Sequence, residues 1–146
     1  MSPTQIDVFW MKRCAEFAQE SLDTGDAAVG ALLVRQSDNQ EIAHAQETVL
    51  SAGDLTGHAE INVLRRGVTI LGISDLSGCT LYTTVEPCWM CSYLLRELRV
   101  SRIVIGRPLF DIGGASSLYP ILRDISVPEW GQPPEIVFFD SSTSSL

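Results

Sequence analysis

The sequence predicts an α/β fold in which a five-stranded mixed sheet lies between helices on both faces. Segments with apolar residues at helical spacing alternate along the chain with short strand-like runs, and this alternation is typical of α/β domains. At 146 residues the chain can bury a substantial core, and 45% hydrophobic against 19% charged residues is an ordinary globular composition. We therefore expect residues 1–146 to form a single three-layer α/β/α domain.

The elements can be assigned in chain order from periodicity and from the residues that begin or end them. Thr4 and Asp7 form a capping pair before a helical pattern that continues to Gly25. Gly67 ends the second helical pattern, and Pro87 suits the first position of the third helix. The expected order is a helix up to Gly25, strands at 29–34 and 41–45, a helix at 58–66, a strand at 80–84, a helix at 87–98, a strand at 102–106, a helix at 116–124 and a strand at 135–139.

One histidine and two cysteines offer three zinc-type ligands. His58 opens the second expected helix, and Cys88 and Cys91 share one face near the N-terminus of the third, where thiolates are favoured. An imidazole and two thiolates fill three positions of a tetrahedral Zn²⁺ shell and leave the fourth for water, as in a catalytic rather than a structural site. We therefore predict a catalytic zinc ion on these three residues.

The same residues resemble the signature of a known superfamily. His58-Ala59-Glu60, followed by Pro87-Cys88-Trp89-Met90-Cys91, is similar to the motif pair of the cytidine-deaminase-like superfamily. Residues 83–91 and 29–31 look most like the branch that holds bacterial tRNA adenosine deaminases, guanine deaminases and the fungal cytosine deaminase. The likeness runs from about residue 5 to about residue 125. It implies the superfamily's strand order and a zinc-dependent hydrolytic deamination.

Glu60, two residues after the zinc histidine, is the candidate general acid–base. In the deamination that the resemblance implies, Glu60 would take a proton from the zinc-bound water, pass it to a ring nitrogen and then protonate the departing ammonia. A glutamate in the first turn of a helix also stabilises the helix dipole, which is the structural alternative. The neighbouring His58 favours the catalytic role.

Charge favours a small substrate over a nucleic acid. The chain has 10 Lys and Arg against 18 Asp and Glu, a formal net charge of −8, whereas a tRNA-binding protein needs basic side chains to meet phosphates. Arg123 is the one basic residue in positions 108–146, whereas the resemblance implies a basic C-terminal helix in tRNA deaminases. We therefore expect a free nucleobase or related amino-heterocycle as substrate, of the guanine, cytosine, isocytosine or amino-triazine type.

A tRNA adenosine deaminase is the alternative within the same branch. A local patch of basic side chains would support tRNA binding. Five arginines could form such a patch, although we expect them to lie on a solvated helix surface. These are Arg65, Arg66, Arg96, Arg99 and Arg102.

Glu47 is the first candidate for binding the substrate. The branch usually has an asparagine eleven positions before the zinc histidine, and Glu47 holds that position in this chain. An ionised glutamate only accepts hydrogen bonds, so it suits a heterocycle with two adjacent N–H groups, such as an amino-purine, an isocytosine-like pyrimidine or an amino-triazine. The alternatives are a shifted loop register that presents Gln46, or a solvated Glu47 without a role.

Four further residues are candidates for the substrate pocket. Asp111 lies near the position where guanine deaminases of the branch hold an acidic residue for the purine amino group, although Asp-x-Gly-Gly is also a turn pattern. Glu129 and Trp130 are similar to the C-terminal acidic and aromatic cap of the fungal cytosine deaminase. Trp89, inside the cysteine motif, is the fourth.

Two other classes of protein share part of the pattern. A redox protein would use Cys88 and Cys91 as a disulfide pair without stoichiometric zinc. A non-catalytic binding module stabilised by zinc would keep its metal and tolerate the loss of Glu60. Zinc content and the effect of mutating Glu60 separate these classes from a deaminase.

The remaining expectations concern location, thiols and assembly. The start of the chain has no apolar run of signal-peptide length, so we expect a cytoplasmic protein without a membrane segment. Cys14 and Cys79 have no partner at metal-ligand spacing and are expected to be buried free thiols. The resemblance implies a homodimer with active sites completed across the interface, and the apolar stretch from Trp89 to Leu95 gives the third helix more than one face to bury.

Overall fold

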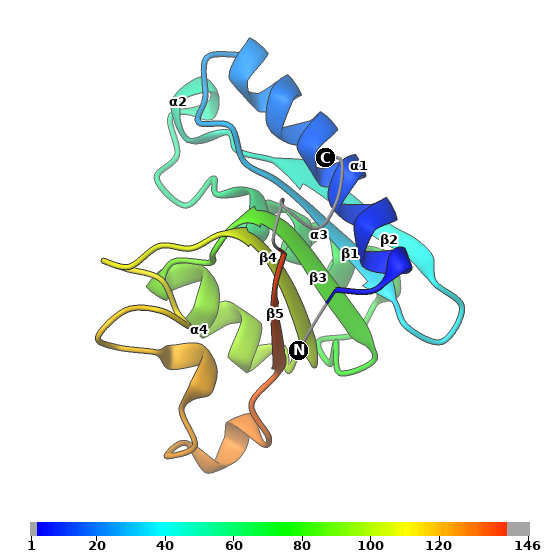
Figure 1. The fold of residues 1–146 in the computed structure, drawn as a ribbon, viewed down its shortest axis with the longest axis vertical. Coiled ribbons are helices and arrows are strands. Elements are labelled where there is room, and N and C mark those ends of the chain that lie inside the picture. The colour runs from blue at the N-terminus through cyan, green and yellow to red at the C-terminus, as the bar shows by residue number, and fades with distance from the viewer. Residues whose placement is uncertain (1–2, 140–146) are drawn as a thin grey trace.

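The structure is a computed structural model that describes residues 3–139 and arranges them in three layers (Figure 1). The central layer is a five-stranded sheet in the order β2-β1-β3-β4-β5. β1 (Gly30–Arg35) pairs antiparallel with β2 (Gln40–Gln46) and with β3 (Cys79–Val85), whereas β4 (Arg102–Arg107) and β5 (Glu135–Phe138) continue the sheet in parallel with β3. The predicted five-stranded mixed sheet is confirmed, and its change from antiparallel to parallel pairing falls at β3.

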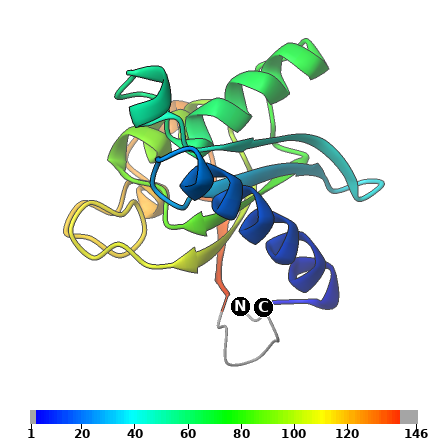
Figure 2. The ribbon, with the colours of Figure 1, turned by 90° about the horizontal axis from the view of Figure 1, so that it is seen from above.

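Helices cover both faces of this sheet (Figure 2). α1 (Gln5–Asp23) lies on one face, and α3 (Ala59–Leu71) and α4 (Trp89–Glu97) lie on the other. Because successive strand residues point to opposite faces, Leu32 packs in the cluster under α1 and Leu33 in the cluster under α3 and α4. Both leucines are fully buried, which explains why β1 reads as a continuous apolar run.

α1 begins at the residue that the sequence predicts. The hydroxyl of Thr4 accepts a hydrogen bond from the Asp7 N–H, and the Asp7 carboxylate accepts one from the Thr4 N–H, so the capping box is complete. The same carboxylate accepts hydrogen bonds from the Tyr82 hydroxyl and from Arg102. The cap therefore also ties α1 to β3 and β4.

The predicted end of the second long helix is wrong. Gly67 was expected to end it, but α3 continues to Leu71 and ends at Gly72, whose φ of 69° is left-handed. A Cβ at position 67 would lie 2.4 Å from Cδ2 of Leu33. The close approach of the helix to Leu33 of β1 accounts for glycine at position 67, which does not act as a terminator.

The predicted helix at 116–124 is also wrong. The segment between β4 and β5 is irregular apart from two single 3₁₀ turns, η1 (Ile121–Arg123) and η2 (Pro128–Trp130). Its backbone N–H groups bind elsewhere, because Ser116 donates to the side chain of Glu86 and Leu122 donates to the carbonyl of Gly114. Tertiary contacts thus take the donors that a helix would use.

Smaller differences affect the two segments that carry the zinc ligands. The loop before His58 contains a short helix, α2 (Val49–Ala52). α4 begins at Trp89 with Cys88 as its N-cap residue, so Pro87 lies just before the helix and not at its first position. His58 is likewise the N-cap residue of α3. Cys88 and His58 are therefore N-cap residues, and the zinc ligands still lie at helix N-termini.

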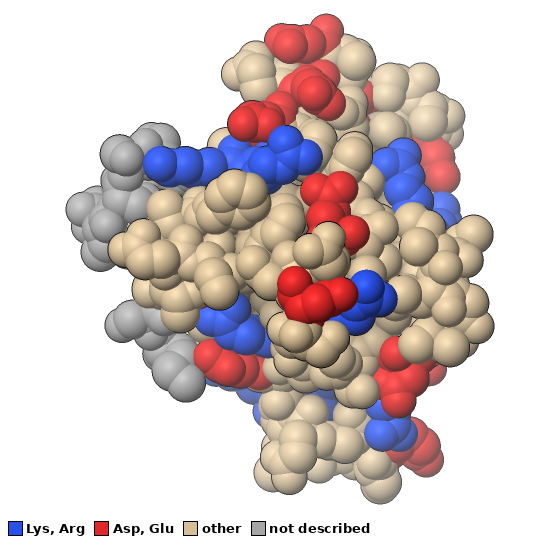
Figure 3. Space-filling view, turned by 90° about the vertical axis from the view of Figure 1, so that its right-hand side faces the viewer, with Lys and Arg blue, Asp and Glu red and all other residues tan. Residues whose placement is uncertain are grey.

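The expectation that five arginines lie on a solvated surface is wrong for two of them. Arg96 is 2% exposed and donates to the carbonyls of Ile121 and Asp124, and Arg102 is held by Asp7. On the face drawn in Figure 3, basic and acidic side chains are interspersed. Within residues 3–139, no helix combines the length and the apolar character needed to cross a membrane.

Candidate active site

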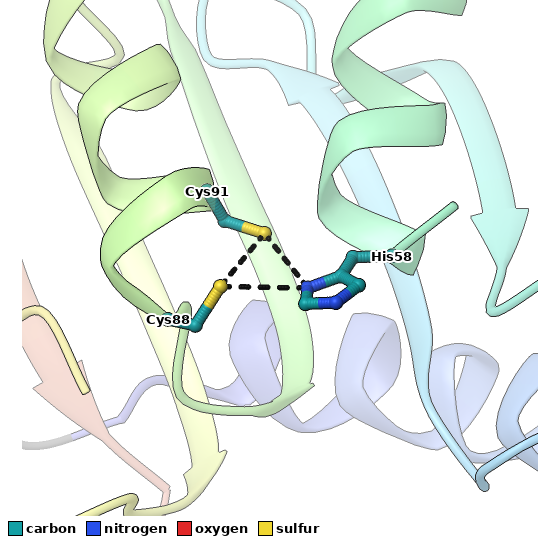
Figure 4. A group of neighbouring side chains, drawn as sticks. All are labelled: His58, Cys88 and Cys91. Carbon is teal, nitrogen blue, oxygen red and sulfur yellow. Dashed lines mark hydrogen bonds between the residues drawn. The ribbon is translucent and has the colours of Figure 1, made fainter. Parts of the chain in front are cut away.

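The ligand-bearing helices α3 and α4 both begin beside the carboxyl end of β3 (Figure 4). This is the end of a sheet where open α/β folds place their ligands. The loop before α3 is held by Asn62, whose side-chain amide donates to the carbonyls of Gln46 and Gly57 and to the hydroxyl of Thr48. One amide therefore joins β2 to the loop and fixes the position of His58.

The three ligand atoms have the geometry of a zinc site. Nδ1 of His58 lies 3.4 Å from the sulfur of Cys88 and 3.4 Å from that of Cys91, and the two sulfurs are 3.6 Å apart. Tetrahedral Zn²⁺ with bonds of about 2.3 Å to sulfur and about 2.0 Å to nitrogen separates two sulfurs by about 3.8 Å and sulfur from nitrogen by about 3.5 Å. The three side chains converge on one point (Figure 4), so the predicted zinc site is confirmed.

The three ligand groups are coupled through the hydrogen bonds between them. The hydrogen bond with Cys91 lowers the pKa of the Cys88 thiol to about 4, and the same bond raises the pKa of Cys91. The hydrogen bond with Cys88 raises the pKa of His58 to about 8. Without a metal, these groups share protons that must leave when zinc binds, so zinc affinity depends on pH.

Glu60 lies inside the site. Its side chain belongs to the first turn of α3 and is 4% exposed. Burial raises the pKa of its carboxyl to about 8. Glu60 lines the same cavity as the ligands His58 and Cys88, which is where a general acid–base would have to lie.

A cavity of about 150 Å³ adjoins the metal ligands. This is smaller than the roughly 300–1,000 Å³ of sites for drug-sized ligands and suits a single heterocycle. Three carboxylates line it together with apolar side chains. The lining residues are Glu47, Glu60 and Glu86, the metal ligands His58 and Cys88, and the apolar Val29, Val85, Leu109 and Ile112.

The structure places Glu47 in this cavity beside the metal ligands. Its backbone N–H donates to the carbonyl of Val29, which continues the pairing of β1 and β2 by one residue. Partial burial raises the pKa of the Glu47 carboxyl. Glu47, eleven positions before His58 in the sequence, therefore lines the cavity beside the metal ligands, and its role in binding a substrate stays a prediction. Gln46, the alternative, is not among the residues that line the cavity.

The other four substrate candidates lie outside the lining of the cavity. The Trp89 indole donates to Ser117. Asp111 is exposed, and its carboxylate accepts the N–H of its neighbour Ile112. Glu129 and Trp130 form part of η2, which packs against the second half of α4, where Trp130 donates to the Glu97 carboxylate. A role for these four in binding the substrate stays a prediction.

Sequence reasoning missed Glu86 and the apolar walls. Glu86 is 1% exposed, and its carboxylate accepts the backbone N–H groups of Leu109, Ala115 and Ser116. A charged residue at the end of a buried strand, directly before Pro87, was the available signal. Leu109 and Ile112 gave no such signal, because only the fold of the loop brings them to the cavity.

Comparison with known proteins agrees with this geometry. The family model described as the cytidine and deoxycytidylate deaminase zinc-binding region matches residues 4–107. A tRNA-specific adenosine deaminase of Aquifex aeolicus is 32% identical over 116 residues, which are 80% of this chain and 76% of that protein. A guanine deaminase of Bacillus subtilis is 37% identical over 83 residues, 56% of this chain and 52% of the relative.

A solved structure from a study of A-to-I editing by tRNA:A34 deaminases superimposes with a TM-score of 0.78. It is 29% identical in sequence, and the match covers 89% of this chain and 96% of that one. The similarity therefore extends through the fold as a whole and is not confined to the metal ligands.

Proposed function

Because the chain belongs to the family of cytidine and deoxycytidylate deaminases, whose zinc-binding region it contains, we propose that it hydrolytically deaminates a free nucleobase or a related amino-heterocycle. That it is a zinc-dependent deaminase follows from the family and the ligand set. The class of substrate is the proposal. Its main support is the position of Glu47 in a cavity of single-ring to double-ring size, next to the metal ligands.

The reaction replaces an amino group of the ring by a carbonyl oxygen from water and releases ammonia. When bound, zinc supplies a water that loses a proton near neutral pH and can act as the nucleophile. Glu60, buried beside His58, is positioned to receive that proton, to place it on a ring nitrogen and to deliver a proton to the leaving amino group. Leu109 and Ile112 give the cavity apolar lining against which the ring can pack.

Glu47 selects among rings because it offers two acceptors and no donor. A half-buried carboxylate that receives a ring N–H and an adjacent amino group forms charge-assisted hydrogen bonds, which are stronger than neutral ones. Guanine and isocytosine-like or amino-triazine rings present such an edge. Adenine lacks it, and cytosine presents its amino group beside a bare ring nitrogen. The acidic composition of the chain agrees with a substrate that carries no phosphates.

Adenosine in tRNA is the second candidate, and the named relatives support it more strongly than the first. The Aquifex aeolicus relative is a tRNA-specific adenosine deaminase. The superimposed structure comes from a study of A-to-I editing by tRNA:A34 deaminases. A flipped-out base would occupy the same small cavity while its sugar and phosphates stay outside. Against this candidate stand the net charge of −8 and the burial or pairing of Arg96 and Arg102.

One experiment separates the two candidates. The zinc-loaded protein is incubated with guanine, isocytosine, cytosine, ammeline-type amino-triazines, adenosine and a tRNA that carries adenosine at the wobble position, and ammonia and product bases are measured. Release of ammonia from guanine, isocytosine or a triazine, with no inosine formed in the tRNA, supports the first proposal. Inosine in the tRNA without turnover of any free ring would replace it by the second.

A further inference from the structure

We propose that Glu86 is a positioning residue of the active site, because its carboxylate holds the loop of residues 109–116 so that Leu109 and Ile112 form one wall of the substrate cavity. The inference rests on the proposed function, since the wall matters for catalysis only if the cavity binds the substrate ring. It assigns a role to a buried carboxylate that neither binds the metal nor transfers the proton.

The hydrogen bonds of Glu86 connect the segment that carries Cys88 and Cys91 to the loop of residues 109–116. Oε1 accepts the N–H of Leu109 at 3.1 Å, and Oε2 accepts the N–H groups of Ala115 and Ser116, each at 2.9 Å. Among the described residues, no Lys or Arg forms an ion pair with this carboxylate. A charge buried to this degree needs full compensation, and backbone dipoles of the loop provide it. The path of the loop is therefore tied to the position of one side chain.

The two glycines of the loop show how close this contact is. A Cβ at Gly113 would lie 1.9 Å from Oε2 of Glu86, and a Cβ at Gly114 would lie 1.9 Å from the Ser92 hydroxyl. Neither glycine has a positive φ, so the close approach is the reason for glycine at both positions. The Asp-x-Gly-Gly segment, which the sequence allowed to be a simple turn, is the part of the loop that docks on Glu86 and α4.

The same loop also touches the metal-ligand segment through its backbone. Gly113 forms a β-bridge with Cys88, and the N–H of Gly114 donates to the carbonyl of Pro87 at 2.8 Å. The zinc ligands themselves are held by the starts of α3 and α4. Loss of the Glu86 carboxylate should therefore displace the wall formed by Leu109 and Ile112 while the ligands keep their places.

The test replaces the carboxylate by an amide of the same shape. In Glu86→Gln, the amide NH₂ group replaces either Oε1, the acceptor of one loop N–H, or Oε2, the acceptor of two, so at least one backbone N–H loses its acceptor. We expect full zinc content, a kcat within about threefold of wild type and a KM raised about tenfold, the effect of one lost charge-assisted hydrogen bond. Amide hydrogen exchange should become faster at Leu109, Ala115 and Ser116. Glu20→Gln, an exposed glutamate on α1, is the control for loss of one charge and should change none of these quantities.

Gly113→Ala tests the same wall with Glu86 intact, because the added methyl group overlaps both the carboxylate and the backbone carbonyl of Leu109, so the loop has to shift. KM is measured for whichever of guanine, isocytosine, cytosine, an amino-triazine and adenosine the wild type deaminates fastest. If the wild type deaminates none of them, the proposed function fails, and the wall is tested by the rate at which EDTA removes zinc. That rate should rise about tenfold in both variants, as expected when a hydrogen bond worth about 1.4 kcal/mol is lost.

Two results would overturn the inference. One is unchanged hydrogen exchange at the three amides in Glu86→Gln. The other is a fall in kcat at unchanged KM and unchanged rate of zinc removal, because a smaller folded fraction alone produces that pattern. If Glu86→Gln does not fold, the same criteria apply to Gly113→Ala.

Discussion

Arg102 binds Asp7 through two parallel hydrogen bonds of 2.8 Å, Nη1 to Oδ1 and Nη2 to Oδ2. The two residues are 95 positions apart, and the pair joins the first turn of α1 to the first residue of β4. Asp7 is 1% exposed. Burial by itself would raise the pKa of its carboxyl, but the hydrogen bonds from Arg102, Thr4 and Tyr82 outweigh it and lower the pKa to about 2.

This pair predicts a stability contribution that is lost in acid. The folded-state pKa of about 2 lies below the ordinary value of 3.8. The stabilisation is therefore fully present above about pH 4 and disappears as the pH falls toward 2, and its size is about 2 kcal/mol. Asp7→Asn should lower the free energy of unfolding by at least that amount at pH 7, since it also leaves Arg102 without its partner.

Urea unfolding at pH 7 and at pH 2.5 measures this effect. The decrease in the free energy of unfolding caused by Asp7→Asn should be clearly smaller at pH 2.5 than at pH 7. Asp38→Asn is the matched control, because Asp38 forms a pair of 3.0 Å with Arg35 on the exposed surface, where such pairs contribute less than about 1 kcal/mol. Equal losses at both pH values in Asp7→Asn would contradict the assignment.

Zinc binding should depend on each of the three ligands. Cys91→Ala should lose stoichiometric zinc and activity, because two remaining ligands satisfy neither the coordination geometry nor the charge of the ion. Metal analysis of the purified variant checks this. Cys79→Ala, a buried thiol of β3 outside the ligand group, should keep its zinc. Full zinc and full activity in Cys91→Ala would show that the metal site is assigned wrongly.

Glu60→Ala should separate metal binding from proton transfer. The variant should keep its fold and its zinc, because Glu60 is not among the three converging ligand residues. Its turnover should fall by at least about 10²-fold, the usual effect of removing a general acid–base. Turnover and zinc content are measured on the same preparation. A variant with near-normal turnover would exclude Glu60 as the proton carrier.

Glu47→Gln should change the order of substrates. The amide restores a donor beside an acceptor, so rings with two adjacent N–H groups should lose rate, and cytosine or adenosine should gain relative to them. Sites that hydrogen-bond a substrate discriminate by up to about 10⁴–10⁵-fold against analogues that leave these groups unpaired. Rates on guanine, isocytosine, cytosine and adenosine are compared in the two proteins. Unchanged rates and an unchanged order would remove Glu47 from substrate recognition.

A homodimer is the expected assembly, with the exposed side of α4 in its interface. Leu95 of this helix is fully buried, whereas Tyr93 is 54% and Met90 37% exposed, so the helix keeps an apolar side toward the outside. Light scattering should give twice the mass of the chain for the wild type, and Tyr93→Glu should shift the protein toward the monomer. A wild type that is monomeric at micromolar concentration would refute the assembly.

Much of the metal site could be predicted from the sequence alone, because its determinants are local. Cys88 and Cys91 share a helix face through their spacing, and His58 and Glu60 belong to one helix start, so residue types and short distances along the chain define the chemistry. The strands could be assigned for the same reason, because alternation and β-branched runs are properties of each segment.

Other features depend on which segments meet in space, and only the tertiary structure decided them. Gly67 continues α3 because Leu33 lies against it, and the segment after β4 is no helix because Glu86 and Gly114 bind its backbone groups. Arg96 is buried under η1 and η2 although its position in the sequence suggests a helix surface. In each case a contact between residues distant in the chain outweighs local propensities, which amount to less than about 1 kcal/mol per residue.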